Sequence, residues 1–77
     1  MDRQAEVARL GQSDRHIASA EKNVSEQRMR VEKLRQHGHD VELAEKMLRS
    51  FEASLATLQG HRELITKTIE GIDNGSV

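Results

Sequence analysis

The sequence predicts an all-α protein, an antiparallel two-helix coiled-coil hairpin that turns back near its midpoint. Apolar residues recur at alternating spacings of three and four, which is the period of paired helices and not of a β-strand. The 77-residue chain contains no proline, so no residue forces a break within either arm. At the midpoint, Gly38 and Asp40 supply a helix stop and a helix cap in close succession. This arrangement favours a short connection, and short connections join antiparallel neighbours.

The expected boundaries describe one domain, residues 1–77, with a helix over 3–37, a bend at 38–40, a helix over 41–71 and a frayed tail at 72–77. Asp2 suits the cap of the first helix because its carboxylate can accept from free N–H groups of the first turn. Gly11 leaves two interpretations open, a continuous helix or a short one that restarts at Ser13. We favour the continuous helix, because the heptad repeat keeps its phase and places Gly11 at position b, where it costs about 1 kcal/mol.

The other glycines have different expected roles. Gly38 enters the left-handed region without a Cβ penalty, as the position after a helix end requires. Gly60 falls at position f on the outer face, so the second helix should pass through it. Gly71 is the expected stop of that helix, and the residues beyond it are expected to fray.

Heptad positions a and d form the predicted interface between the helices, here called the seam. Its apolar residues are Leu10, Ile17, Val24, Val31, Leu34, Val41, Leu48, Phe51, Leu55, Leu58, Ile65 and Ile69. Because Leu48 and Phe51 lie far from the fraying ends, they are expected to be the residues whose truncation destabilises the hairpin most.

Polar residues interrupt the seam at a few positions. Folding at the bend brings Ser13 opposite Arg62, with Asp14 beside them. Arg62 is expected to pair with Asp14 and fix the register of the helices, which is a simpler role than binding an anion. Gln27, at position d, has the same interpretation.

Charge and composition exclude several function classes. Lys and Arg nearly balance Asp and Glu, leaving a formal net charge of −1, so the basic excess typical of a phosphate-binding surface is missing. The chain contains no cysteine, which excludes a disulfide framework and a thiolate metal site. We find neither an apolar signal-peptide run nor a membrane-length segment, so a cytoplasmic location is expected. No catalytic triad, carboxylate pair or phosphate loop is present, which indicates a non-enzymatic protein with no small-molecule substrate and no cofactor.

Four histidines are the remaining candidates for chemistry. His16 and His61 both fall at position g, and the hairpin register places them opposite each other across the seam. With Asp14 as a third ligand, this pair would suit a divalent transition metal. Since no ligand motif accompanies them, the simpler interpretation is two exposed histidines that flank the seam. His37 and His39 flank the bend, where a histidine complements the helix dipole.

A resemblance to a known group rests on a run through the middle of the chain. Its residues are His16-Ile17, Glu21, Gln27-Arg28, Val31, Leu34, Gly38-His39-Asp40, Ala44, Leu48 and Phe51-Glu52. This run resembles a group of short uncharacterised proteins of soil and root-associated alphaproteobacteria. The resemblance implies a bacterial, cytoplasmic helical hairpin and implies no mechanism.

The leading functional hypothesis is a small structural or interaction protein that acts through helix–helix association. Val7 and Met47 flank the seam, and Leu43 and Leu64 lie at position c, so the apolar surface is wider than one hairpin covers. A homodimer, in the form of an antiparallel four-helix bundle, would cover it, as would a partner helix. The alternatives are a His-based divalent metal binder and a nucleic-acid-binding arm, and the balanced charge argues against the latter.

Overall fold

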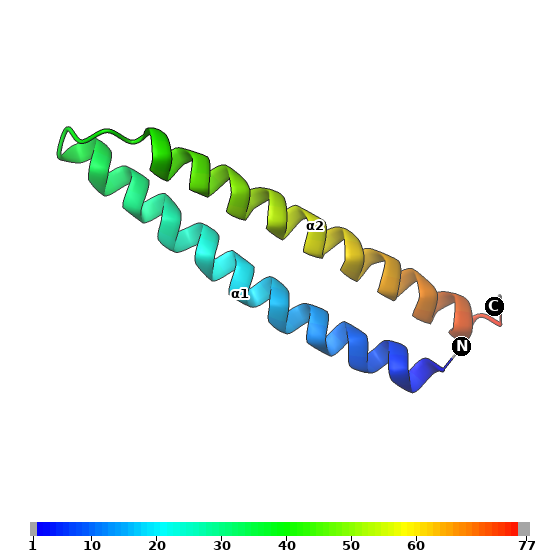
Figure 1. Cartoon of the computed structure of the whole chain (residues 1–77). Coiled ribbons are helices and arrows are strands. Elements are labelled where there is room, and N and C mark those ends of the chain that lie inside the picture. Colours follow the sequence, from blue (N-terminus) through cyan, green and yellow to red (C-terminus); the bar gives the residue numbers. More distant parts are fainter. Residues whose placement is uncertain (1, 76–77) are drawn as a thin grey trace.

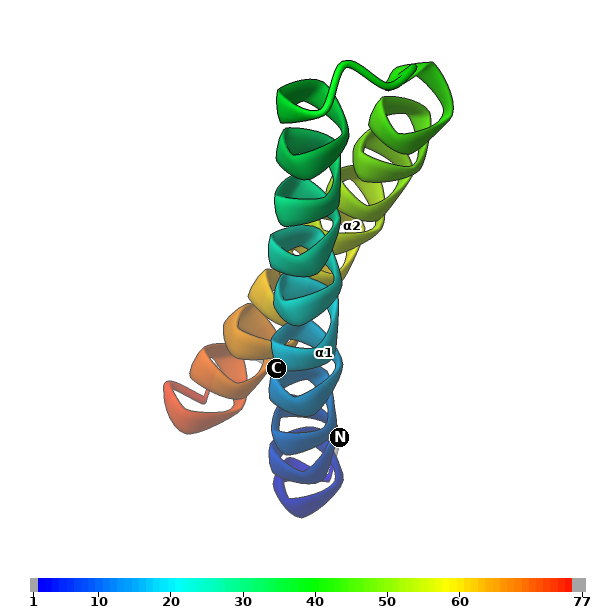
Figure 2. The same cartoon turned by 90° about the vertical axis from the view of Figure 1, so that its left-hand side faces the viewer.

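The computed structural model describes residues 2–75, which form two long helices joined by one short connection (Figure 1). Helix α1 spans Arg3–Gln36 and helix α2 spans Glu42–Asp73, and residues 2–75 contain no β-strand. The predicted all-α helical hairpin is therefore confirmed. The helices run antiparallel and bring both ends of the chain to the same end of the molecule, and Figure 2 shows that they are inclined to each other.

The hairpin is a thin rod, not a compact globule. Its principal extents are 58 × 15 × 13 Å and its Cα radius of gyration is 17.4 Å. A compact domain of the same length would have a radius of gyration of about 11.5 Å. Neither helix of the described part combines the length and the apolar character needed to cross a membrane.

Helix α1 begins where its cap predicts. The Asp2 side chain accepts a hydrogen bond from the Gln4 N–H at 2.9 Å. The helix then continues through Gly11 without a restart at Ser13, which confirms the continuous interpretation. It ends at Gln36, one residue before the predicted boundary.

The connection closes α1 with a glycine in the left-handed region. Gly38 has φ of 70°, its N–H donates to the Arg35 carbonyl at 3.1 Å, and the His39 N–H donates to the Leu34 carbonyl at 2.9 Å. These two bonds form a Schellman motif, which satisfies carbonyls that the helix end leaves free. Asp40 then accepts from the Glu42 N–H at 3.0 Å, as its predicted capping role requires.

The predicted end of the second helix was wrong. Helix α2 passes through Gly71 as well as Gly60 and ends at Asp73, because a glycine inside a helix lowers stability without breaking the hydrogen-bond ladder. Gly75 has φ of 69°, and its N–H donates to the Ile72 carbonyl at 3.1 Å. Residues 76–77 of the predicted tail lie outside the described part.

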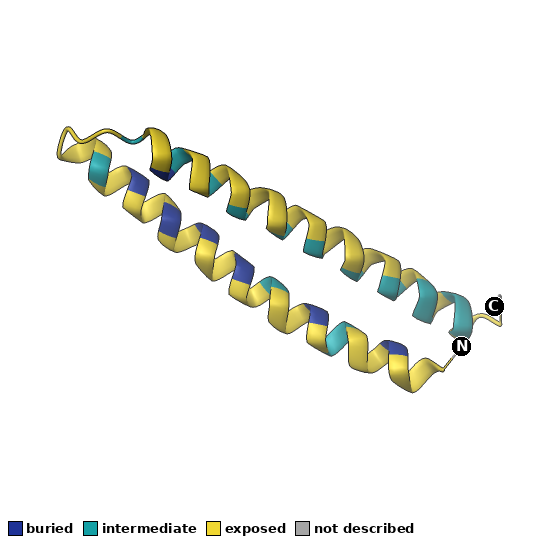
Figure 3. Ribbon diagram, viewed as in Figure 1, coloured by how far each residue is buried: buried dark blue, intermediate teal, exposed yellow. Residues whose placement is uncertain are grey.

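None of the predicted seam residues is exposed, and the buried and half-buried positions lie mainly along the sides of the two helices that face each other (Figure 3). Among the large ones, Val24 and Val31 are buried, while Leu48 and Phe51 are only half-buried. That truncation of those two residues destabilises the hairpin most stays a prediction. Two helices meet along a line, so a long side chain placed there extends past the contact and leaves its flank open. The remaining buried residues are small or polar: Glu6, Ser13, Ala20, Gln27 and Ala44.

Candidate helix-helix interface

The seam has two edges, and ion pairs between the helices define the first. This edge, here called the ion-paired edge, contains Arg35–Glu45 at 2.9 Å, Arg28–Glu52 at 3.2 Å, Arg62–Asp14 at 2.5 Å and Arg3–Asp73 at 2.6 Å. All these residues occupy heptad positions a or e. Because position e of one antiparallel helix faces position e of the other, the four pairs lie along the same side of the hairpin.

Arg62 pairs with Asp14, as the sequence predicted. The arginine occupies a seam position, but its guanidinium leaves the seam and meets a carboxylate at position e of α1. Both side chains stay about half exposed, at 43% and 53%. The pair therefore positions the helices without burying a charge, which a long arginine stem allows.

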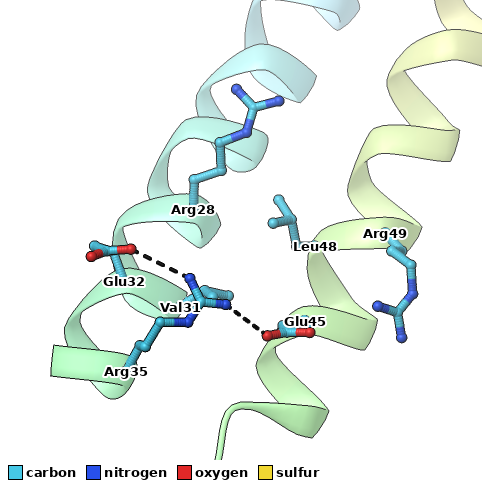
Figure 4. A pocket seen from close by; sticks show the side chains of 7 residues that line it. All are labelled: Arg28, Val31, Glu32, Arg35, Glu45, Leu48 and Arg49. Atoms are coloured by element: carbon cyan, nitrogen blue, oxygen red, sulfur yellow. Dashed lines mark hydrogen bonds and ion pairs between the residues drawn. The ribbon is translucent and has the colours of Figure 1, made fainter. Parts of the chain in front are cut away.

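Near the bend, the ion-paired edge covers a shallow groove of about 400 Å³ (Figure 4). Val31 and Leu48 lie between the helices, and the Arg35 guanidinium contacts Glu45 at 2.9 Å and Glu32 at 3.5 Å. Charged side chains thus border the apolar part of the seam on this side. An apolar partner that docked here would have to desolvate these charges, which is costly.

At the end of the hairpin farthest from the bend, the Arg3 guanidinium contacts the carboxylate of Asp73. The hydrogen bond from Arg3 holds the pKa of Asp73 below its usual value, and the charge attraction adds to that effect. The same bond raises the pKa of Arg3. This contact joins the first residue of α1 to the last residue of α2, beyond the predicted stop at Gly71.

A buried hydrogen bond fixes the register of the two helices. The Gln27 side chain is only 3% exposed, and its Nε2 donates to the Ala44 carbonyl of α2 at 3.0 Å. A shift of one helix along the other would leave the buried amide without an acceptor, so Gln27 selects one register.

Glu6 is a buried charge that the sequence analysis missed. Its side chain is buried, and its Oε1 contacts the Arg9 guanidinium at 2.9 Å. The signal was available, because Glu6 lies one heptad before Ser13 and so occupies a d position of the seam. Because the seam was predicted from its apolar residues, the glutamate at this d position was not included.

The second edge, here called the open edge, is formed largely by small and uncharged side chains, although position g of α1 also supplies Arg9 and Arg30. It has a groove of about 360 Å³ lined by His16, Ser19, Ala20, Asn23, Phe51, Ser54 and Leu58. A smaller depression of about 160 Å³ continues it toward Ile65. Among residues 2–75, no ion pair crosses this edge. The half-buried side chains of Phe51 and Leu58 therefore remain accessible from this side.

Helix α2 extends the open edge with a strip that carries no formal charge. The strip consists of its c and g positions: Leu43, Met47, Ser50, Ser54, Thr57, His61, Leu64, Thr68 and Gly71. Every Asp, Glu, Lys and Arg of α2 lies at another position, although charged residues are frequent in this helix. Leu43 is 72% exposed and Leu64 is 63% exposed, so two large apolar side chains project into solvent. The sequence analysis noted these leucines but missed the continuity of the strip.

The hydroxyl groups of two strip residues have internal partners. Thr57 Oγ1 donates to the Ala53 carbonyl at 3.1 Å, and Thr68 Oγ1 donates to the Leu64 carbonyl at 2.9 Å. Each donor is thereby satisfied within α2. Covering these threonines would not strand an unpaired O–H donor, which removes one of the main costs of burying a polar group.

The candidate metal ligands of the alternative hypothesis do not come together as a set. His16 and His61 line the same small depression on the open edge, as the register predicted. Asp14, the expected third ligand, instead binds Arg62 on the ion-paired edge. In the described part of the chain, no group of three or more His, Cys, Asp or Glu side chains is placed to hold a metal ion. At the bend, the His37 and His39 rings lie 6.4 Å apart.

Half of the cationic side chains take part in ion pairs within the described part of the hairpin. Ion pairs engage Arg3, Arg9, Arg28, Arg35, Arg62 and Lys67, out of 12 Lys and Arg residues. A nucleic-acid-binding arm would need unpaired cations along one face to displace counterions from phosphates. The distribution of charge therefore does not favour the nucleic-acid hypothesis.

Comparison of the chain with family models, curated proteins and solved structures finds no match. The resemblance to short alphaproteobacterial proteins consequently stays a prediction from the sequence. The open edge and the uncharged strip of α2 are the surface from which a function has to be argued.

Proposed function

We propose that this protein is a small, non-enzymatic interaction protein of the cytoplasm that acts by helix–helix association. Its docking surface would be the uncharged strip of α2 together with the open edge of the seam. The observation that carries the proposal is the difference between the edges. Ion pairs between the helices border one edge, whereas on the other edge α2 combines accessible apolar side chains with small, uncharged ones.

The surface area of the hairpin supports an association of this kind. The chain exposes 5754 Å². A monomeric protein of 8.7 kDa is expected to expose about 4,700 Å², which leaves an excess of about 1,000 Å². A standard protein–protein interface covers about 800 Å² on each partner. One interface of ordinary size would therefore bring the exposed area close to that of a compact protein.

The chemistry of the surface favours a helix as the occupant. The strip follows the axis of α2 over most of its length, from Leu43 to Gly71, so it matches a long partner and not a compact ligand. Its regular c and g spacing is suited to knobs-into-holes packing, which supports a coiled-coil-like arrangement. Exposed leucines at both halves of the strip would supply the apolar contacts.

Site-specific photo-crosslinking in cells tests the proposal. A photoreactive amino acid replaces Leu64 in the strip, and the matched control replaces Gln59, which is exposed on the ion-paired side of the same helix. We expect light-dependent adducts of defined mass from position 64 and none from position 59. Adducts of equal yield from both positions, or none from either, would contradict a dedicated docking surface.

A further inference from the structure

We propose that the occupant of this surface is a second copy of the chain, and that two α2 helices pair antiparallel about a twofold axis near Thr57. This inference rests on the proposed function, because it names the partner of the same surface. The pairing of two hairpins in this way produces a four-helix bundle with α2 helices at its centre.

The first argument is charge. A partner that carried charged residues toward the strip would bury them opposite side chains that offer no counter-charge, at a large desolvation cost. The strip positions of a second copy, which are spread over the 29 residues from Leu43 to Gly71, also contain no Asp, Glu, Lys or Arg. A second copy therefore brings no charged side chain of its strip against the strip of the first.

The second argument is the distribution of large and small side chains. A twofold axis makes an interface self-complementary, so a bulky residue must meet a small one at the symmetry-related height. With the axis near Thr57, Leu43 of one copy lies at the height of Gly71 of the other. Leu64 lies at the height of Ser50 by the same symmetry. At both of these heights, a leucine of one copy therefore meets a small residue of its antiparallel copy.

The third argument concerns the middle of the strip and the helix dipoles. Ser50, Ser54 and Thr57 are small, so two α2 axes can approach closely there, and the Thr57 hydroxyl is already satisfied by the Ala53 carbonyl. Antiparallel helices also place each positive N-terminus beside a negative C-terminus. A parallel pairing would instead bring Leu43 against Leu43 and leave small residues against small ones.

Cysteine scanning tests this arrangement directly, because the chain has no cysteine of its own. We would make Thr57→Cys, Leu43→Cys and Gln59→Cys, and oxidise each purified full-length chain at micromolar concentration. Across an antiparallel twofold axis near residue 57, the two thiols of a Thr57→Cys pair come within disulfide reach. The two Leu43 positions lie 28 residues apart along the paired helices, which is about 42 Å. Gln59 is two residues from Thr57 but about 200° around the helix.

The expected result is at least a tenfold faster disulfide dimerisation of Thr57→Cys than of either other variant. Rapid dimerisation of Leu43→Cys would overturn the antiparallel pairing, and equal rates for Thr57→Cys and Gln59→Cys would show random collision and overturn the interface. A mixture of Ser50→Cys and Leu64→Cys chains gives a second readout, in which the heterodimer should exceed both homodimers. If none of these chains dimerises while position 64 still captures another protein in cells, self-pairing fails and the proposed function stands. If position 64 captures nothing either, both fail.

Discussion

Along the ion-paired edge, guanidinium and carboxylate groups of α1 and α2 meet in pairs. Along the open edge, α2 presents serine, threonine and histidine, and the arginines of α1 at position g, Arg9 and Arg30, have no ion-pair partner across the seam among the described residues. The ion pairs are exposed, so each contributes little to stability, typically about 0–1 kcal/mol. They nevertheless specify which residues of the two helices meet. The open edge has no ion pairs between the helices of the described part that would determine which residues meet. Its half-buried Phe51 and Leu58 would lose further apolar surface to water if a partner covered them, which is favourable. The comparison indicates that the ion pairs joining the two helices gather on one edge of the seam, and the proposed docking surface begins at the other.

The largest effect is expected from charges placed on the uncharged strip. In the variant with both Leu43→Lys and Leu64→Lys, each lysine would be buried without a counter-charge on association. We expect the dissociation constant of the complex to rise about 100-fold, or roughly tenfold for each lysine. Sedimentation velocity measures the change, with circular dichroism as the check that the hairpin still folds. Gln59→Lys, on the other side of α2, should leave association unchanged. An equal loss in that control would remove the distinction between the edges.

The next effect concerns the seam that lies between the two edges. Gln27→Ala removes the buried hydrogen bond to the Ala44 carbonyl and the packing of the side-chain stem. We expect the free energy of unfolding to fall by about 1–2 kcal/mol in urea titration. The exposed Gln59→Ala variant should stay within about 0.5 kcal/mol of the unmodified chain. Indistinguishable midpoints for the two variants would mean that the register is set elsewhere.

A smaller effect is expected at the ion-paired edge. Arg62→Leu should be tolerated or slightly stabilising, because an apolar side chain packs in the seam as well as a half-exposed ion pair does. A double-mutant cycle with Arg62→Ala and Asp14→Ala should give a coupling of about 0.2–1 kcal/mol. A substantial loss of stability in Arg62→Leu would assign the arginine a role beyond joining the helices.

The smallest effect is the pH dependence of the terminal contact. Since Arg3 lowers the pKa of Asp73 in the folded chain, this pair stabilises the fold above the ordinary pKa of the carboxyl. The contribution disappears as the pH falls through the lowered value. We therefore expect the melting temperatures of the unmodified chain and Arg3→Gln to differ slightly at neutral pH and to converge in acid. NMR titration should also show Asp73 losing its proton at lower pH in the unmodified chain than in Arg3→Gln. A difference in melting temperature that grows on acidification would have the wrong sign.

Much of the fold could be predicted because its signals are local. Gly38 and Asp40 perform the stop and the cap that their residue types favour, and the heptad spacing alone identifies seam residues of which none is exposed. The end of α2 could not be placed in the same way, because Gly71 and Gly75 are the same residue type. Which of the two adopts a positive φ depends on where the helix stops making contacts, including the one between Arg3 and Asp73.

Depth within the seam and the identity of the candidate site were harder to predict. Leu48 and Phe51 lie mid-seam in the sequence pattern and yet are only half-buried, because burial in a pair of helices depends on lateral cover, and the small residues Ala20 and Ala44 fill the line of contact. The ion pair of Arg62 with Asp14 followed from the register alone. The uncharged strip of α2, by comparison, becomes visible only when the charges of that helix are sorted by heptad position and not counted for the whole chain.

Sedimentation equilibrium of the unmodified chain over a dilution series tests the central claim most directly, with thermal melts on the same samples. If the open edge and the uncharged strip pair two copies, the mass at micromolar concentration should be twice the 8.7 kDa of one chain. On dilution, the mass should fall toward that of a single chain, and the melting temperature should fall with it. A mass of one chain at every concentration, with a melting temperature that dilution does not change, would contradict the account.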